Sequence, residues 1–286
     1  MMKRFALALG EENTNGAMSL SPHRYKHTTL IASQGLCENI VKLTFKLNPT
    51  ESLHSLGFDL GLGDFIRIKV NGVSRGRAFS PTSSPEILGS FTITVKIYEK
   101  GEITPYLEKM FANDKVLICG PCPVPWLTRK LSQSHKHTLI VALGIGVTEA
   151  IFMCESELLN RKIVTLLISV QKFDDLIFST EIANLRSKFP ETFVVHTTLT
   201  REKKEHFHNS RPSVELFRLV FASALQDPTS SAVLVVGTKK MNRELYSMFL
   251  VLKCSTKLLR MGVRLFGREH SALHTNIRKH QITLPS

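Results

Sequence analysis

The hydrophobic pattern of the chain changes at the proline-rich segment Pro121-Cys122-Pro123-Val124-Pro125. Before this segment, short alternating apolar runs are separated by turn-rich pieces, which is typical of an antiparallel barrel. After it, apolar strands alternate with helical segments, which predicts a parallel sheet with helices on both faces. The sequence therefore predicts two domains of different architecture, and a length of 286 residues suits two ordinary cores.

The predicted domains have defined limits. Residues 1–18 form a disordered or targeting tail, residues 19–128 an antiparallel β-barrel, residues 137–270 an α/β doubly wound parallel-sheet domain, and residues 271–286 a C-terminal tail. The strands expected in the barrel are Thr28–Ala32, Ile40–Leu47, Phe65–Val70, Phe91–Tyr98 and Lys115–Cys119. The second domain is expected to contain the strands Thr138–Leu143, Ile163–Val170, Phe193–Thr198 and Ala232–Gly237, with helices at Glu149–Asn160, Ser179–Lys188, Ser213–Leu225 and Asn242–Lys253.

One predicted strand of the barrel, Phe91–Tyr98, has a polar face that carries Thr94, Lys96 and Tyr98. Beside it we expect the short segment Arg77-Ala78-Phe79-Ser80, so that a cation, an aromatic ring and hydroxyl groups come together. Such groups can hold a pyrophosphate and stack against a flavin. Gly101 then gives a turn, and Thr104 is expected to cap a short helix whose free N–H groups attract phosphate.

Three motifs in this order resemble the flavin domain of the ferredoxin–NADP reductase superfamily, and most closely its NADH-cytochrome b5 reductase-like flavoprotein reductases. They are Arg77-Ala78-Phe79-Ser80, Val95-Lys96-Ile97-Tyr98 and Gly101-Glu102-Ile103-Thr104-Pro105-Tyr106-Leu107. The resemblance implies a barrel that binds FAD and an enzyme that passes electrons from NADH or NADPH, through FAD, to a haem or iron–sulfur electron carrier.

The resemblance also implies roles for individual residues at the flavin. Arg77 would pair with the FAD pyrophosphate, Phe79 would lie against the flavin, and Ser80 would hydrogen-bond near its reactive N5 atom as the catalytic residue. The other residues implied in FAD binding are Ala78, Thr94, Lys96, Tyr98, Ile103 and Thr104.

A second site is expected at the carboxyl ends of the parallel strands, where open sheets bind their ligands. Gly144 and Gly146, in Leu143-Gly144-Ile145-Gly146-Val147-Thr148-Glu149, let the backbone approach a pyrophosphate. The resemblance implies that the nicotinamide nucleotide is held by Gly144, Gly146, Thr148, Gly237 and Met241. Ile145, Glu149 and Thr238-Lys239-Lys240 depart from the pattern of the resembled family, which leaves open a module that holds FAD without reductase activity.

The choice between NADH and NADPH depends on the loop Thr198-Leu199-Thr200-Arg201-Glu202-Lys203-Lys204. An acidic residue favours NAD, whereas arginine accommodates a 2′-phosphate. Cytochrome b5 reductases carry aspartate where Thr200 stands, while Thr200-Arg201-Glu202 resembles the Ser-Arg-Glu of the NADP-type reductases, so both donors remain open. Near the C-terminus, Phe266 is a candidate for an aromatic residue over the flavin ring.

Composition limits the partners and the compartment. The formal net charge is +13, which suits nucleic acid, an acidic membrane or an acidic protein partner, but the basic residues are spread along the chain, so a dedicated nucleic-acid site is not expected. The resemblance implies a small acidic redox protein (cytochrome b5-like or ferredoxin-like) as the partner. No apolar run is long enough for a transmembrane segment. Five scattered cysteines indicate a reducing, intracellular location, cytoplasmic or associated with an organelle such as the mitochondrion or the endoplasmic reticulum surface.

Two constellations carry no function in this interpretation. Cys119-Gly120-Pro121-Cys122 spells the thioredoxin motif, but Pro123 and Pro125 disfavour the helix that lowers a thiol pKa in thioredoxins. His206-Phe207-His208 has no acidic or sulfur companion, and no metal site is predicted from it.

Overall fold

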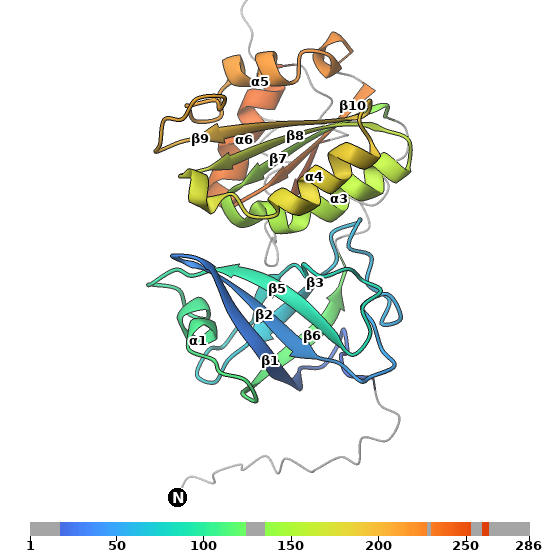
Figure 1. The fold of residues 1–286 in the computed structure, drawn as a ribbon, viewed down its shortest axis with the longest axis vertical. Coiled ribbons are helices and arrows are strands. Elements are labelled where there is room, and N and C mark those ends of the chain that lie inside the picture. Colours follow the sequence, from blue (N-terminus) through green and yellow to red (C-terminus); the bar gives the residue numbers. More distant parts are fainter. Residues whose placement is uncertain (1–17, 124–134, 228–229, 253–258, 263–286) are drawn as a thin grey trace, which may run out of the picture.

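A computed structural model covers the chain, and it describes residues 18–123, 135–227, 230–252 and 259–262. Figure 1 shows two stacked halves, with an antiparallel sheet in the N-terminal half and a parallel sheet in the C-terminal half. The predicted fold class is therefore confirmed. The limits predicted for the domains stay a prediction, because residues 1–17, 124–134 and 263–286 lie outside the described parts of the chain.

The N-terminal half is a six-stranded antiparallel sheet with the strand order β4-β3-β6-β1-β2-β5. After β4, Pro81 forms a bridge with Ile93 of β5, and the N–H of Thr82 donates to the carbonyl of Thr92 at 2.8 Å, so the sheet closes into a barrel. The strands are β1 (Lys26–Cys37), β2 (Ile40–Lys46), β3 (Phe65–Lys69), β4 (Arg77–Phe79), β5 (Ser90–Lys96) and β6 (Lys115–Cys122).

The inside of the barrel is filled by the apolar residues of the alternating runs. Phe45 of β2 stacks on Phe91 of β5 with ring centroids 5.6 Å apart, and both side chains are fully buried. Several predicted strand ends differ from the structure. Strand β1 is longer than predicted, and β6 continues past Cys119 to Cys122. Strand β5 ends at Lys96, because Tyr98 enters the turn that leads to helix α1 (Thr104–Glu108).

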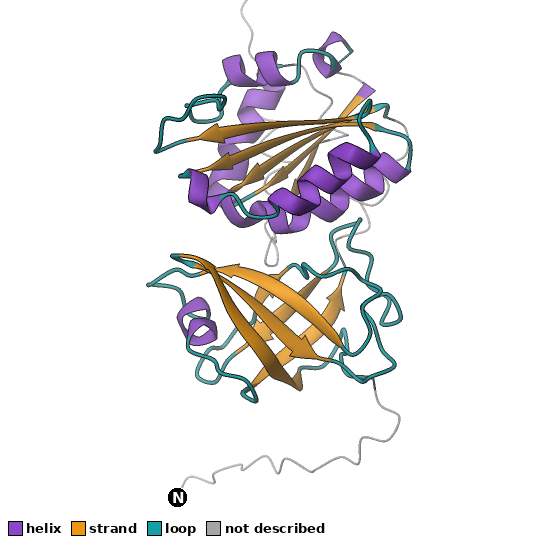
Figure 2. Ribbon diagram, in the orientation of Figure 1, coloured by secondary structure: helices purple, strands orange, loops and turns teal. Residues whose placement is uncertain are grey.

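The C-terminal half is a five-stranded parallel sheet with the order β11-β10-β7-β8-β9. Figure 2 shows its helices on both faces. Helices α3 and α4 pack on one face through Ile151 and Ile182, whereas α5 and α6 pack on the other through Phe217 and Phe249. The elements are β7 (His137–Leu143), α3 (Val147–Leu159), β8 (Ile163–Val170), α4 (Ser179–Lys188), β9 (Phe193–Leu199), α5 (Val214–Val220), β10 (Ser231–Val236), α6 (Lys239–Val251) and β11 (Leu259–Gly262).

Helix ends differ from the predictions in ways that local chemistry explains. Ser213 caps α5 as predicted, because its Oγ accepts the N–H of Leu216 at 3.2 Å. Helix α5 nevertheless ends at Val220, and a separate 3₁₀ turn, η3 (Ala224–Gln226), follows it. Helix α6 begins at Lys239, three residues earlier than predicted, since the Thr238 hydroxyl accepts the N–H of Met241 at 3.4 Å. Within the described residues, no helix combines the length and the apolarity needed to cross a bilayer.

Candidate functional site

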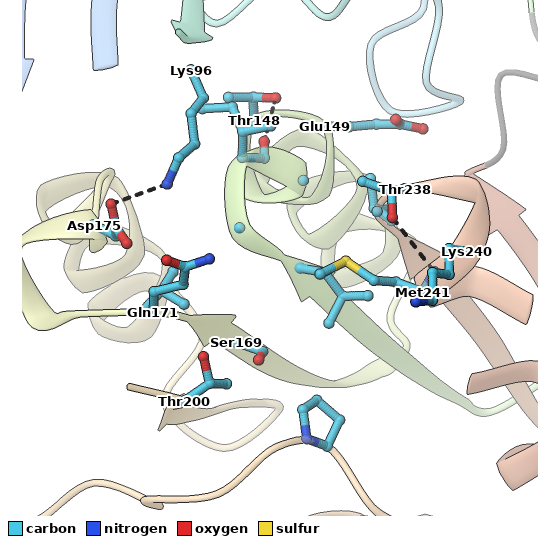
Figure 3. A pocket seen from close by; sticks show the side chains of 18 of the residues that line it. Lys96, Thr148, Glu149, Ser169, Gln171, Asp175, Thr200, Thr238, Lys240 and Met241 are labelled. Carbon is cyan, nitrogen blue, oxygen red and sulfur yellow. Dashed lines mark hydrogen bonds and ion pairs between the residues drawn. The ribbon is translucent and has the colours of Figure 1, made fainter. Parts of the chain in front are cut away.

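A cavity of about 870 Å³ lies between the barrel and the parallel sheet, with walls from both. The barrel contributes residues of β4 and β5, and the sheet contributes the loops that follow β7, β8, β9 and β10 (Figure 3). All of the predicted site residues line this cavity except Arg77 and Ile103: they are Ala78, Phe79, Ser80, Thr94, Lys96, Tyr98, Thr104, Gly144, Gly146, Thr148, Gly237 and Met241.

The barrel wall combines a ring with a set of hydroxyl groups. Phe79 and Ser80 follow each other at the end of β4, with Ser80 buried and Phe79 half-buried. The hydroxyl of Thr82 lies 3.2 Å from that of Thr94 and 3.1 Å from that of Thr92, which fixes the orientation of Thr94 on β5. The wall therefore offers a flat apolar contact edged by oriented hydrogen-bonding groups.

Arg77 and Ile103 lie outside the cavity for different reasons. The guanidinium of Arg77 forms an ion pair with the carboxylate of Glu102, and about half of each side chain is exposed. Ile103 packs its side chain into the barrel core, so it could contribute to phosphate binding only through its backbone. The ion pair places the Arg77 cation beside the start of α1, where the sequence predicted a phosphate.

The predicted cap of helix α1 is wrong. The helix begins at Thr104 itself, after Ile103, and no side chain caps it. The Thr104 hydroxyl instead accepts the N–H of Tyr98 at 3.1 Å and donates to its carbonyl at 3.3 Å, which ties the helix to the end of β5. Gly101 is required in this turn, because an added Cβ would lie 2.6 Å from the Thr104 hydroxyl and 2.9 Å from the Tyr98 carbonyl oxygen.

An ion pair joins the two halves at the edge of the cavity. The Nζ of Lys96, on β5, lies 3.3 Å from a carboxylate oxygen of Asp175, in the 3₁₀ turn η2 (Phe173–Asp175) after β8 (Figure 3). Both side chains are about 15% exposed. Lys96 was predicted as a site residue, but Asp175 was not, since no local pattern links residues so far apart in the sequence.

The sheet wall is built around a glycine turn and one close backbone approach. The 3₁₀ turn η1 (Gly144–Gly146) joins β7 to α3, and Gly144 has a φ of +55°, a conformation that glycine adopts without strain. An added Cβ on Gly146 would lie only 2.3 Å from the carbonyl oxygen of Val236, so the start of α3 sits directly against β10. The Thr148 hydroxyl donates to the carbonyl of Ile145 at 2.9 Å and holds this turn (Figure 3).

The charges on the sheet wall are mixed. Glu149, in the first turn of α3, is 8% exposed and lines the cavity, which places a carboxylate where the resembled family has proline. Lys240 also lines the cavity, at the start of α6 (Figure 3). Farther along the wall, after β9, Arg201 and Arg211 add two guanidinium groups.

Several cavity residues were missed from sequence. Ser169 and Gln171 line the cavity at the end of β8, and Arg211 and Pro212 line it from the segment before α5. The rule that parallel sheets bind ligands at the carboxyl ends of their strands could have found Ser169 and Gln171. Arg211 has no such signal, because it comes from a long connection after β9. Phe266 lies outside the described residues, and no metal-binding group is found within them.

Comparisons with known proteins agree with this geometry. Residues 27–124 match the family model for the oxidoreductase FAD-binding domain. The chain is 24% identical to NADH-cytochrome b5 reductase 1 of Candida glabrata over 224 residues, which cover 76% of this chain and 77% of that protein. It is 25% identical to NADH-cytochrome b5 reductase 1 of Mycosarcoma maydis over 61% of this chain, but this match spans only about half (53%) of the relative.

Solved structures show the same fold at low identity. The cytochrome b5 reductase domain of Ulva prolifera nitrate reductase superposes with a TM-score of 0.71 at 19% identity, covering 86% of this chain and 100% of that one. A ferredoxin NADP+ reductase from Neisseria gonorrhoeae with bound FAD and NADP gives a TM-score of 0.68 at 16% identity, covering 84% and 99%.

The fold and the cavity define a two-domain flavoprotein of the reductase class, with an FAD-binding barrel followed by a nucleotide-type parallel sheet. The barrel matches the oxidoreductase FAD-binding domain, and the chain is similar over about three quarters of its length to an NADH-cytochrome b5 reductase. The predicted resemblance to cytochrome b5 reductase-like flavoprotein reductases is therefore confirmed. The residues present also fit a flavin, because the barrel wall supplies a ring, oriented hydroxyl groups and a lysine around a cavity of about 870 Å³.

Proposed function

We propose that this protein is an FAD-dependent NAD(P)H oxidoreductase that passes electrons to a small haem or iron–sulfur carrier protein. The observation that carries the proposal is the single cavity whose two walls are the flavin-type face of the barrel and the glycine loops of the parallel sheet. When bound, FAD would supply the chemistry that accepts a hydride and releases electrons one at a time.

The residues of the chain would bind and orient the two cofactors. Phe79 would pack against the flavin ring, while the hydroxyl groups of Ser80 and Thr94 would donate hydrogen bonds to its edge. Arg77 would exchange its exposed partner Glu102 for the FAD pyrophosphate, a stronger charge-assisted contact. On the other wall, Gly144 and Gly146 would let the backbone approach the nucleotide donor, which fixes its reactive end toward the barrel.

The proposed electron acceptor is a small acidic redox protein, cytochrome b5-like or ferredoxin-like. The support for this is the net charge of +13, which would steer an acidic carrier toward the protein and would make their association sensitive to salt. The relatives named NADH-cytochrome b5 reductases are consistent with a haem carrier.

The proposed function is tested by loading and reducing the purified protein. We expect the protein to retain FAD after incubation and gel filtration, and its yellow colour to bleach under anaerobic NADH or NADPH. A protein that stays colourless after incubation would contradict FAD binding by the barrel.

A second function, a module that holds FAD without reacting with a nucleotide, is favoured by one observation. The carboxylate of Glu149 lines the cavity at the start of α3, where it would repel the phosphates of a donor. Stable yellow protein that neither nucleotide bleaches would select this alternative. The same experiment therefore separates the two functions.

We expect the donor to be NADPH in preference to NADH. Arg201 and Arg211 line the cavity after β9, and Thr200 stands where NADH-dependent relatives of the superfamily carry an acidic residue. The nearby Glu202 is already engaged, since its carboxylate accepts the N–H of Phe173 at 2.6 Å. Losing one hydrogen bond to a charged group costs about 1.5–3 kcal/mol, so Arg201→Gln should lower the NADPH-to-NADH ratio of kcat/KM about 10- to 100-fold.

The matched control is Lys203→Gln, which removes a cation from the same loop at a position that does not line the cavity. The control should leave the NADPH-to-NADH ratio unchanged, and Thr200→Asp should lower it. A ratio that Arg201→Gln does not change would refute the preference for NADPH.

A further inference from the structure

The outer face of the barrel, away from the cavity, brings the two cysteines of the Cys-Gly-Pro-Cys segment together. Strand β6 carries an extra residue against β3, because Phe65 pairs with Cys122 and Arg67 pairs with Cys119. Directly opposed residues of an antiparallel pair share a face, and Phe65 and Arg67 share one because they are two residues apart. The irregular register therefore turns Cys119 and Cys122 to the same face, whereas a regular strand would place them on opposite faces.

This face is the outside of the barrel. Ile118 of β6 and Ile66 and Ile68 of β3 point into the barrel core, so Cys119 and Arg67 point away from it. On the other side of β6, Lys26 of β1 pairs with Ile118, which places Tyr25 next to Cys119. The cysteines are shielded by these neighbours, with 5% of Cys119 and 9% of Cys122 exposed.

The contacts within this group make the two sulfur atoms unequal. Hydrogen bonds from the Cys122 thiol and the Tyr25 hydroxyl, together with the Arg67 charge, lower the pKa of Cys119 to about 6 even though burial opposes this. The hydrogen bond to Cys119 and burial raise the pKa of Cys122, which keeps its proton. The Cys122 thiol also donates to the carbonyl oxygen of Cys119 at 3.9 Å. Cys119 is the more acidic of the two thiols, and the thiolate is the nucleophilic form. In thioredoxins the start of a helix lowers the pKa of the reactive thiol. Here neighbouring side chains lower the pKa of Cys119, so the lack of a helix does not rule out a reactive pair.

We propose that Cys119 and Cys122 are a redox-active dithiol, separate from the flavin cavity, that hydrogen peroxide converts into an intramolecular disulfide. The Cys119 thiolate would attack one peroxide oxygen; the O–O bond would break, leaving a sulfenic acid on Cys119, and the other oxygen would leave as hydroxide and take up a proton to become water. The Cys122 sulfur would then attack the Cys119 sulfur, forming the S–S bond and releasing a second water. In total two thiols and one hydrogen peroxide give one disulfide and two waters.

Two other cysteines of the described chain serve as internal references. Cys154 is a residue of α3 whose side chain is fully buried. Burial raises the pKa of its thiol, so Cys154 should not react with hydrogen peroxide. Cys37, at the end of β1, is a partly exposed free cysteine. A dithiol-specific reaction is therefore distinguishable from general oxidation of thiols.

The test is differential alkylation of the full-length protein treated with one equivalent of hydrogen peroxide, followed by mass spectrometry. We expect Cys119 and Cys122 to be lost together as one disulfide, about tenfold faster than Cys37 or Cys154, and to return on treatment with dithiothreitol. Oxidation of Cys37 while Cys119 and Cys122 keep their free thiols would overturn the proposal. The experiment needs neither flavin nor nucleotide, so it is independent of the proposed reductase activity.

Two variants separate the chemistry from folding. Cys122→Ser should stop the reaction at the Cys119 sulfenic acid, which dimedone traps as a stable adduct. Tyr25→Phe keeps both thiols and the ring but removes the hydroxyl that contacts Cys119, so the disulfide should form several-fold more slowly. A dimedone adduct on a residue other than Cys119, or an unchanged rate in Tyr25→Phe, would contradict the assigned roles.

Discussion

Replacing Glu157 with alanine is expected to lower the free energy of unfolding by about 3 kcal/mol, because partners buried with it lose their hydrogen bonds. Glu157, on α3, accepts a hydrogen bond from the Thr138 hydroxyl at 2.7 Å and lies 2.8 Å from the His135 ring nitrogen. His135 is only 2% exposed, so water cannot replace the missing carboxylate. Urea denaturation, followed by circular dichroism, measures the difference.

The matched control is Glu155→Ala on the same helix. Glu155 pairs with Lys188 at 3.6 Å, but the side chains are 41% and 55% exposed, and exposed pairs contribute little. The control should lower the free energy of unfolding by less than about 1 kcal/mol. Equal losses in the two variants would show that the buried group around Glu157 has no special role.

The effect of Glu157 also has a defined pH dependence. Burial alone would raise the pKa of Glu157, but hydrogen bonds from His135 and Thr138 and the charge of Lys162 outweigh it and hold the pKa below its usual value. A lowered folded-state pKa means that the stabilisation is present above the ordinary carboxyl pKa of about 4.3 and is lost as the pH falls through the folded-state pKa. The difference between the wild type and Glu157→Ala should therefore shrink in acid.

Gly146→Ala is expected to slow reduction of the bound flavin by NADPH or NADH about 100-fold, because a displacement of about 1 Å at a positioning loop has effects of that size. The added methyl group would lie 2.3 Å from the Val236 carbonyl oxygen, so the start of α3 must move away from β10. The overpacking should also lower the free energy of unfolding by about 1–3 kcal/mol. Anaerobic stopped-flow absorbance measures the rate.

The Gly146→Ala variant should retain FAD normally. Gly146 lies in the turn η1 of the C-terminal half, whereas the flavin is expected to bind the barrel of the N-terminal half. Gly35→Ala is the control, because an added Cβ on Gly35 meets nothing within 4 Å. Loss of FAD from Gly146→Ala, or an unchanged reduction rate, would contradict the assignment of this loop to the nucleotide donor.

The parts of the fold that repeat along the chain were predictable from sequence. Alternation in the strand that contains Phe91 and Ile93 reflects burial of one face, and strand–helix alternation reflects a parallel sheet, so the type of each sheet was predicted correctly. Strand β11 (Leu259–Gly262) was not predicted, because four residues carry too little periodicity and the strand pairs with β10 through contacts distant in sequence.

Contacts between distant residues were the part that the sequence could not provide. His135 falls between the limits predicted for the two domains, where no core residue was expected, although it is buried against Glu157, 22 residues away. The pairing of Lys96 with Asp175 crosses 79 residues and joins two separate cores. Local pattern reports which face a residue occupies, but the partner on that face depends on how the elements pack.

Closure of the barrel leaves its half of the molecule without a free strand edge at the seam where Pro81 meets Ile93. Unpaired strand edges are where copies of a protein join into extended sheets and aggregate. In the parallel sheet the outer described strands are β9 and β11, and the chain returns over β9 to form a bridge between Thr198 and His208. Closure of the barrel therefore removes one route to self-association by strand addition, the route through the seam beside Pro81.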